Sequence, residues 1–337
     1  MTKSASALSL ALLLAAALPA AAEEVNVYTT REPGLFAPLA KAFTEKTGIK
    51  VNTVFVKDGL AERVAAEGAG SPADLLMTVD VGNLVDLADK GLTRPLASEA
   101  VNKLVPANLR AADGAWTALS MRARLVWADR SLGLKAITYE ELADPKWKGK
   151  LCIRSGQHPY NTALIAATIA HDGRDKTKQW LTGVKANLAK KPAGGDRDVA
   201  RDILGGLCTI GVGNSYYVGL MRSGKGGAEQ KTWGEAVDVV VPTFANGGTH
   251  VNISGAAIAR HAPNAAAAVK LVDYLVSPEG QKIFAEQNFE YPVVAGAAVD
   301  PIIAALGKLT ADGVSIAEVA RHRREASLLV DEVGFDQ

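Results

Sequence analysis

The sequence predicts an α/β protein of two lobes, each a sheet flanked by helices, with a ligand cleft between the lobes. The chain has 337 residues, of which 48% are hydrophobic, and this length is enough for two domains with cores of their own. Short apolar runs alternate with helical segments in two separate stretches, an order typical of α/β units. Two long extended segments, residues 116–129 and 249–260, are expected to cross between the lobes.

The first α/β unit follows the order strand, helix, strand, helix, strand, over residues 24–30, 35–47, 49–56, 59–67 and 73–79. Apolar residues alternate in the first of these segments and recur at helical spacing in the second, which Gly48 ends. This order is that of a parallel doubly wound sheet. A helix capped by Asp80 or Asn83 is expected to follow.

The second unit runs from about residue 139 to 241 and holds the strand-like runs LCIR, LCTIGVG and AVDVVVP around the helix-like run TALIAATIAH. An Ala-rich helix follows the second crossing segment. We therefore assign residues 23–125 plus 247–297 to lobe 1 and residues 126–246 plus 298–337 to lobe 2. Ligands of such sheets bind beyond the carboxyl ends of the strands, here in the cleft between the lobes.

Composition and motifs exclude several classes of protein. The chain carries 37 basic and 36 acidic residues, which argues against a nucleic-acid binder with a broad basic surface. Two cysteines are too few for a disulfide-rich scaffold or a zinc-finger array. The sequence has no GxSxG, HExxH or Walker A motif, and its five histidines lack metal-ligand spacing.

The N-terminus has the layout of a secretory signal peptide. Lys3 precedes an apolar stretch over residues 8–18, and three alanines up to Ala22 offer a cleavage site. The alternative, an N-terminal membrane anchor, needs an apolar stretch of about 20 residues. Residues 1–22 are therefore predicted to be removed on export. In an oxidising compartment, Cys152 and Cys208 are expected to form a disulfide, the alternative being two buried free thiols.

Tyrosines mark the predicted cleft. Tyr216 and Tyr217 are adjacent in GVGNSYYVG, and Tyr160 lies in CIRSGQHPYNTAL; both loops follow a predicted strand and precede a predicted helix. Without a binding role, such a pair would consist of one ring buried in the core and one ring at an interface. A phenolate is a hard anionic ligand that suits Fe³⁺, and the metal's charge must displace a proton from a phenol whose pKa is near 10. Together these tyrosines predict a site for ferric iron.

These segments resemble the periplasmic ferric-iron-binding proteins of bacterial ABC importers, which have the transferrin-like type II periplasmic binding protein fold. The resemblance covers essentially the whole mature chain. It rests on the two tyrosine loops and on VYTTR, SPADLLMTVDVGNL, the RAR of SMRARLVW, HVNISGAA and EYPV. It implies a monomeric periplasmic protein that is not an enzyme and does not span the membrane. Its partners would be an inner-membrane permease and the ATPase of that permease.

The resemblance also implies site residues. Tyr160, Tyr216 and Tyr217 match the tyrosinate ligands of ferric iron, and Arg122 matches an arginine that pairs with a synergistic anion such as carbonate in some members. Arg124 is a second candidate for that anion. Members often carry His, or His followed by Tyr, where this chain has Glu32 and Pro33, so Glu32 is the candidate replacement ligand. The residues expected to line the cleft are Tyr28, Arg31 and Asp80.

Two other functions stay open at this point. The same fold serves binding proteins for oxyanions and small organic solutes, and fold alone does not choose among them. A secreted iron-dependent enzyme that uses tyrosinate-bound iron is the alternative from another class.

Overall fold

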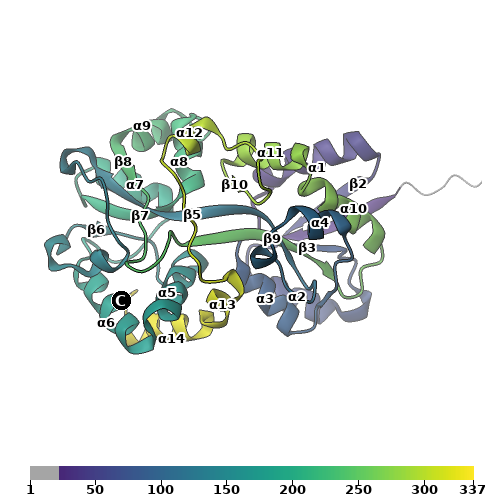
Figure 1. Ribbon diagram of the computed structural model, residues 1–337, viewed down its shortest axis with the longest axis horizontal. Coiled ribbons are helices and arrows are strands. Elements are labelled where there is room, and N and C mark those ends of the chain that lie inside the picture. The colour runs from purple at the N-terminus through teal and green to yellow at the C-terminus, as the bar shows by residue number, and fades with distance from the viewer. Residues whose placement is uncertain (1–22) are drawn as a thin grey trace, which may run out of the picture.

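The computed structural model describes residues 23–337, and the predicted signal peptide, residues 1–22, lies outside the described residues (Figure 1). Two lobes lie side by side, joined by two long strands that run through the middle of the molecule. The predicted α/β architecture with two lobes is confirmed. The boundaries assigned to the lobes stay a prediction.

The first lobe is built on three parallel strands, as the sequence order predicts. The central strand β1 pairs in parallel with both of its neighbours, and the three are β1 (Glu24–Thr29), β2 (Lys50–Phe55) and β3 (Leu75–Thr78). The helices of this lobe are α1 (Pro33–Thr47), α2 (Leu60–Glu67), α3 (Val81–Asp89), α4 (Glu99–Leu104), α10 (Ala265–Leu275) and α11 (Pro278–Asn288). As expected, Gly48 ends α1 in the left-handed conformation, and Asp80 caps α3 by accepting from the Asn83 amide.

The two crossing strands are β5 (Thr117–Asp129) and β9 (Val251–Ala259), which pair antiparallel with each other. Beyond Ala123, β5 exchanges β9 for β7 (Ile210–Asn214) of the second lobe. A single path of strands therefore runs β2-β1-β3-β9-β5-β7-β6 through both lobes, and it is mixed rather than wholly parallel. Three further strands attach to the crossing pair: β4 (Thr93–Arg94), β8 (Val237–Val240) and β10 (Tyr291–Pro292).

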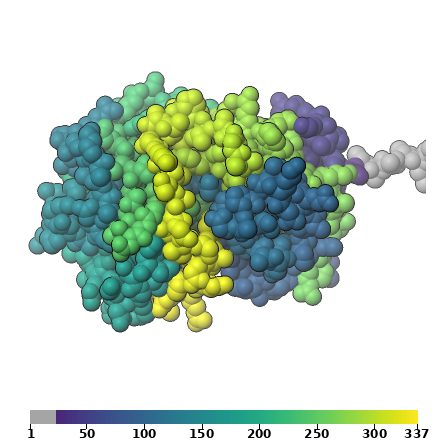
Figure 2. Space-filling view, viewed as in Figure 1, coloured from purple at the N-terminus to yellow at the C-terminus, as the bar shows by residue number. Residues whose placement is uncertain are grey.

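The second lobe packs helices around β7 and its parallel neighbour β6 (Leu151–Cys152). Its helices are α5 (Pro159–Asp172), α6 (Arg174–Ala186), α7 (Asp196–Leu204), α8 (Ser215–Arg222), α9 (Ala228–Ala236), α12 (Pro301–Ala304) and α14 (Arg323–Val333). Helix α13 (Ile316–Arg321) contacts both α3 and α5, and Figure 2 shows the C-terminal segment, in yellow, lying over the junction of the lobes.

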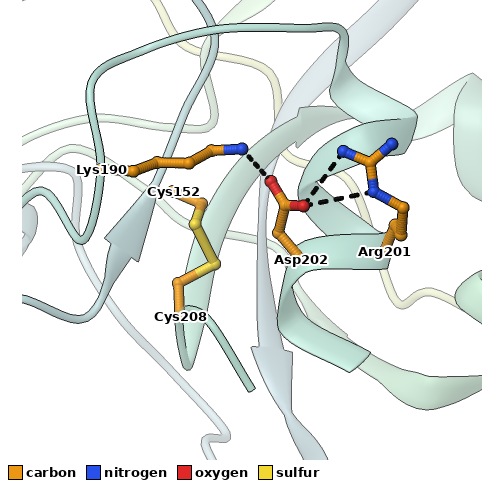
Figure 3. The surroundings of a disulfide bond; sticks show 5 residues. All are labelled: Cys152, Lys190, Arg201, Asp202 and Cys208. Carbon is orange, nitrogen blue, oxygen red and sulfur yellow. Dashed lines mark hydrogen bonds and ion pairs between the residues drawn. A yellow bond between two sulfur atoms is a disulfide. The ribbon is translucent and has the colours of Figure 1, made fainter. Parts of the chain in front are cut away.

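A disulfide joins Cys152 to Cys208, with the two Cα atoms 5.9 Å apart (Figure 3). The predicted pairing is confirmed. Both cysteines are buried, and beside them Asp202 is held by Lys190 and Arg201. Cys152 also pairs with Gly211 in the β6–β7 register. The bond therefore ties β6 to the segment that leads into β7, and these are the two strands that precede the tyrosine-bearing helices.

Candidate metal centre

A cleft of about 670 Å³ opens between the lobes. From the first lobe, the loops after β1, β2 and β3 line it, and from the second, the loop after β6 and the start of α8. The charged and aromatic residues of its lining are Arg31, Glu32, Phe55, Lys57, Asp58, Glu62, Asp80, Arg122, Arg154, His158, Tyr160, Arg197, Tyr216, Tyr217, Glu290 and Arg323.

Tyr160 lies in the first turn of α5, directly after Pro159 at the first helical position. Pro159 suits that position because its missing N–H has no intrahelical partner there. The Tyr160 amide donates to Nδ1 of His158 at 3.3 Å. Burial and the nearby Arg154 lower the pKa of His158 to about 3, so its ring is neutral and Nδ1 accepts. The start of the helix thus fixes the position of the Tyr160 backbone.

Tyr216 and Tyr217 lie in the first turn of α8, directly after the fully buried strand β7. Two glycines let that strand pack closely: a Cβ on Gly213 would lie 2.3 Å from Trp127, and one on Gly211 would lie 2.2 Å from Val199. The Ser215 hydroxyl accepts from the Ala123 amide of β5 at 3.1 Å, which anchors the start of α8. The sequence placed these tyrosines in loops, whereas the structure places them at helix N-termini, where partial positive charge favours phenolates.

The three tyrosines meet at one point of the cleft. The hydroxyls of Tyr160 and Tyr216 are 3.2 Å apart, and the ring centroids of Tyr216 and Tyr217 are 4.1 Å apart. Burial, followed by the proximity of Tyr160, raises the pKa of both Tyr216 and Tyr217 above the ordinary phenol value. These two phenols are therefore neutral at pH 7, and only a strong cation would ionise them.

Guanidinium groups lie over the faces of two of these rings. Arg122 and Arg154 have their Cζ atoms 5.4 and 5.2 Å from the Tyr160 centroid, and Arg197 is 5.4 Å from the Tyr217 centroid. Positive charge at this distance stabilises the negative charge of a phenolate as well as the ring itself. The site therefore combines three phenols with three cations.

The two arginines of the RAR segment have different surroundings. Arg122 lines the cleft, where it donates to the Ser254 hydroxyl at 2.7 Å and to the Ile253 carbonyl at 2.9 Å. Its Nε is buried without a partner in the part of the chain that the structure describes. Arg124 is not among the cleft-lining residues; it is buried and forms an ion pair with Asp196 at 2.5 Å.

Of the four site residues predicted in the first lobe, three line the cleft and one does not. Glu32 is exposed, lines the cleft and precedes α1. Arg31 also lines the cleft and forms a buried ion pair with Glu290 at 2.8 Å. Asp80 lines the cleft too, but its second carboxylate oxygen accepts from the Asn252 amide at 2.8 Å. Tyr28, which the sequence placed at the cleft, is not among the lining residues; its hydroxyl donates to Glu67 at 3.1 Å.

Several cleft residues were not predicted from the sequence, although sequence features near some of them could have placed them in the cleft. Arg154 lies in the loop that leads from β6 to the helix of Tyr160, and Glu290 opens the EYPV segment of the resemblance. No sequence feature predicted Arg197 as a cleft residue, because a charged residue near the start of a helix is usually solvated. Among residues 23–337, no group of three or more His, Cys, Asp and Glu side chains is placed to hold a metal ion. No helix in this range is long and apolar enough to cross a membrane.

The chain is similar to known extracellular solute-binding proteins. A family model described as bacterial extracellular solute-binding protein matches residues 70–305. Iron uptake protein A2 of Synechocystis sp. is 37% identical, over 97% of this chain and 95% of its own length. The major ferric iron-binding protein of Neisseria meningitidis is 32% identical, over 97% of each chain.

Solved structures share the fold closely. A Bordetella ferric binding protein is 60% identical with a TM-score of 0.87, over 94% of this chain and all of its own. A Trichodesmium protein in complex with iron and citrate ligands is 39% identical with a TM-score of 0.86, over 93% of this chain and 99% of its own.

Proposed function

Because this chain belongs to the bacterial extracellular solute-binding proteins, with relatives that are named for ferric iron, we propose that it captures Fe³⁺ in the cleft between its lobes. It then delivers the iron to an ABC permease in the inner membrane, which works together with its own ATPase. In this proposal it works in the periplasm as a monomer after loss of residues 1–22. It acts as a binding protein and not as an enzyme, as the names of its relatives suggest.

The convergence of Tyr160, Tyr216 and Tyr217 carries this proposal. Their phenolic oxygens are hard donors, and three phenolates together balance the charge of Fe³⁺. The 3.2 Å between two of the hydroxyls suits a shared bond to one small cation, since each would then exchange its proton for the metal. The guanidinium groups over the rings favour the ionised form.

The remaining coordination positions come from outside the three tyrosines. Arg122, with a buried Nε free for an acceptor within the described residues, is the candidate to hold a synergistic anion such as carbonate beside the iron. Glu32 is the candidate ligand from the opposite lobe, because its carboxylate is exposed on the cleft wall. Hinge closure about β5 and β9 would bring it towards the tyrosines.

One observation favours a second candidate, a binding protein for an oxyanion or an anionic organic solute. Lys57, Arg197 and Arg323 line the cleft and form no ion pair within residues 23–337. Positive charge on both walls would attract such a ligand, with the tyrosines donating hydrogen bonds to it.

A visible absorption titration separates the two candidates. Chelator-stripped protein is titrated with ferric citrate, and the proposal expects a tyrosinate-to-iron charge-transfer band that saturates at one equivalent. The Tyr217→Phe variant is expected to lose or shift the band. A flat spectrum for the wild-type protein, together with calorimetric binding of citrate alone, would contradict the iron proposal and favour the second candidate.

A further inference from the structure

A buried polar cluster lies beside the chain segments that carry the three tyrosines. It consists of Arg124, Asp196, Asn161 and Asn214, and none of these side chains is more than 3% exposed. Asn161 follows Tyr160 in the chain, and Asn214 is the residue before α8, which carries Tyr216 and Tyr217. The cluster therefore lies between the two segments that supply the phenols.

Arg124 bridges these two segments. Its Nη2 donates to the Asn161 side-chain oxygen at 2.6 Å, and its Nη1 donates to the Asn214 side-chain oxygen at 3.2 Å. The Asn161 amide group in turn donates to the carbonyls of Arg154 and Ser155, at 2.8 and 3.0 Å. The planar guanidinium of Arg124 thus fixes the start of α5 relative to the start of α8. Arg124 itself is a residue of strand β5.

Asp196 completes the cluster from the first position of α7. One of its oxygens accepts from Arg124 Nη1 at 2.5 Å and from the Asn214 backbone N–H at 2.8 Å. Its other oxygen accepts from Arg154 Nη1 at 3.3 Å, and that guanidinium lies over the Tyr160 ring. A single carboxylate therefore holds Arg124, the backbone that precedes α8 and one of the two guanidinium groups over Tyr160.

We propose that Arg124 and Asp196 form a positioning clamp, which holds the segments bearing Tyr160 and Tyr216 so that their oxygens meet at one metal ion. The proposal rests on the proposed function, because it concerns the geometry of the same iron site. Neither residue touches the iron. Groups that orient metal ligands from behind commonly change metal affinity by about 10–100-fold when they are altered.

The clamp is distinct from a stabilising core contact. Buried ion pairs add little to stability compared with apolar residues of similar volume, because desolvation offsets their attraction. What an apolar pair cannot supply is the directed set of hydrogen bonds from one guanidinium to both segments. Stability and iron geometry should therefore respond differently to substitution.

The experiment titrates iron into full-length mature variants and records the charge-transfer band, the affinity and the thermal midpoint of unfolding. Asp196→Asn and Arg124→Lys weaken the clamp, whereas the double variant Arg124→Met with Asp196→Leu replaces the ion pair by apolar side chains. Asp74→Asn is the matched control: it is a buried carboxylate of the first lobe that accepts from the backbone N–H groups of Asn26 and Asn264 at 2.8 and 2.6 Å.

The clamp predicts about 10–100-fold weaker iron binding and a shifted band for Asp196→Asn and Arg124→Lys. The double variant should regain much of the unfolding midpoint but not the band or the affinity. Asp74→Asn should unfold at a lower temperature with the wild-type band and affinity. Where the single variants fail to fold, the double variant carries the same test.

Clamp variants that keep the wild-type band and bind iron within about threefold of wild type would overturn the clamp alone. So would an equal band shift in Asp74→Asn, since the effect would then be one of general stability. A wild-type protein that develops no band would overturn the proposed function together with the clamp.

Discussion

The two walls of the cleft are built in different ways. On the wall of the second lobe, three tyrosines lie in the first turns of two helices, and a disulfide, close-packed glycines and a buried ion pair support the segments around them. On the wall of the first lobe, Asp80 and Arg31 already have protein partners, and Glu32 is exposed. Under the proposed function, the second lobe therefore carries a preformed half-site for iron, and the first lobe contributes on closure.

This difference predicts the order of events in binding. Iron should bind first to the tyrosine wall, because its ligands are already within reach of one another, and closure should follow as a hinge motion. The predictions below test the difference between the walls, from the largest expected effect to the smallest.

Removal of a phenol should have the largest effect. Tyr216→Phe keeps the buried ring but removes an anionic ligand, so iron affinity should fall by more than about 100-fold, beyond the range of outer-shell changes. Competition with a chelator of known affinity measures the loss. Asp80→Asn on the opposite wall serves as comparison and should cost far less; an equal loss in both variants would contradict the asymmetry of the walls.

Iron affinity should fall steeply as the pH is lowered. Burial raises the pKa of Tyr216 and Tyr217, so the iron-free protein keeps these protons while the complex has released them. The complex binds fewer protons, and by linkage the affinity therefore rises with pH, by a factor of up to about ten per pH unit for each proton displaced. Proton release measured on iron addition in weak buffer should approach three per iron. A release near zero would exclude phenolate ligands.

Loss of the disulfide should lower stability more than it lowers affinity. The bond ties β6 to the segment that leads into β7, and removal of a native disulfide typically costs about 2–5 kcal/mol. Cys152→Ser with Cys208→Ser should therefore lower the free energy of unfolding by that order, as urea denaturation measures. If the folded variant lost iron binding without losing stability, the bond would act on the site directly.

The smallest effect is expected at Glu32. Exposed surface charges contribute about 0–1 kcal/mol, which corresponds to at most about fivefold in affinity. As the proposed ligand from the first lobe, Glu32 should exceed this limit, so Glu32→Gln is expected to weaken iron binding by more than about fivefold but by less than Tyr216→Phe does. A loss of less than about fivefold would mean that the carboxylate is only a solvated neighbour, whereas a loss of more than about tenfold would establish it as the ligand from the first lobe. Either result sharpens the comparison, because it measures how much that wall contributes after closure.

The sequence predicts the three cleft tyrosines better than it predicts the buried residues, Arg124 and Asp196, that support them. Strand-end position placed Tyr160 near Tyr216 and Tyr217, since parallel strands bring their ends to one edge of a sheet. The surroundings of Arg124 could not be predicted in this way. Arg124 and Arg122 are two positions apart in one strand, so their side chains project from the same face of the sheet. Their neighbours nevertheless differ, because β5 pairs with β9 at Arg122 and with β7 at Arg124. Asp196, the partner of Arg124, is 72 residues away in the chain.

The first-lobe wall shows the same limit. Tyr28 alternates with Val27 along β1, but helices cover both faces of this sheet, so alternation alone does not tell which face meets the cleft. The Arg31–Glu290 ion pair joins residues 259 positions apart, and no local pattern predicts it. The sequence therefore predicts which residues could bind a metal ion. The ion pairs between residues far apart in the chain can be identified only from the folded structure.

The central claim, that three tyrosinates of the second lobe hold ferric iron, is tested most directly by a crystal structure of the iron-loaded protein with diffraction data on both sides of the iron absorption edge. The account predicts one anomalous peak in the cleft, bonded to the phenolic oxygens of Tyr160, Tyr216 and Tyr217. An iron peak bonded to other groups, with these three hydroxyls hydrogen-bonded among themselves, would contradict it.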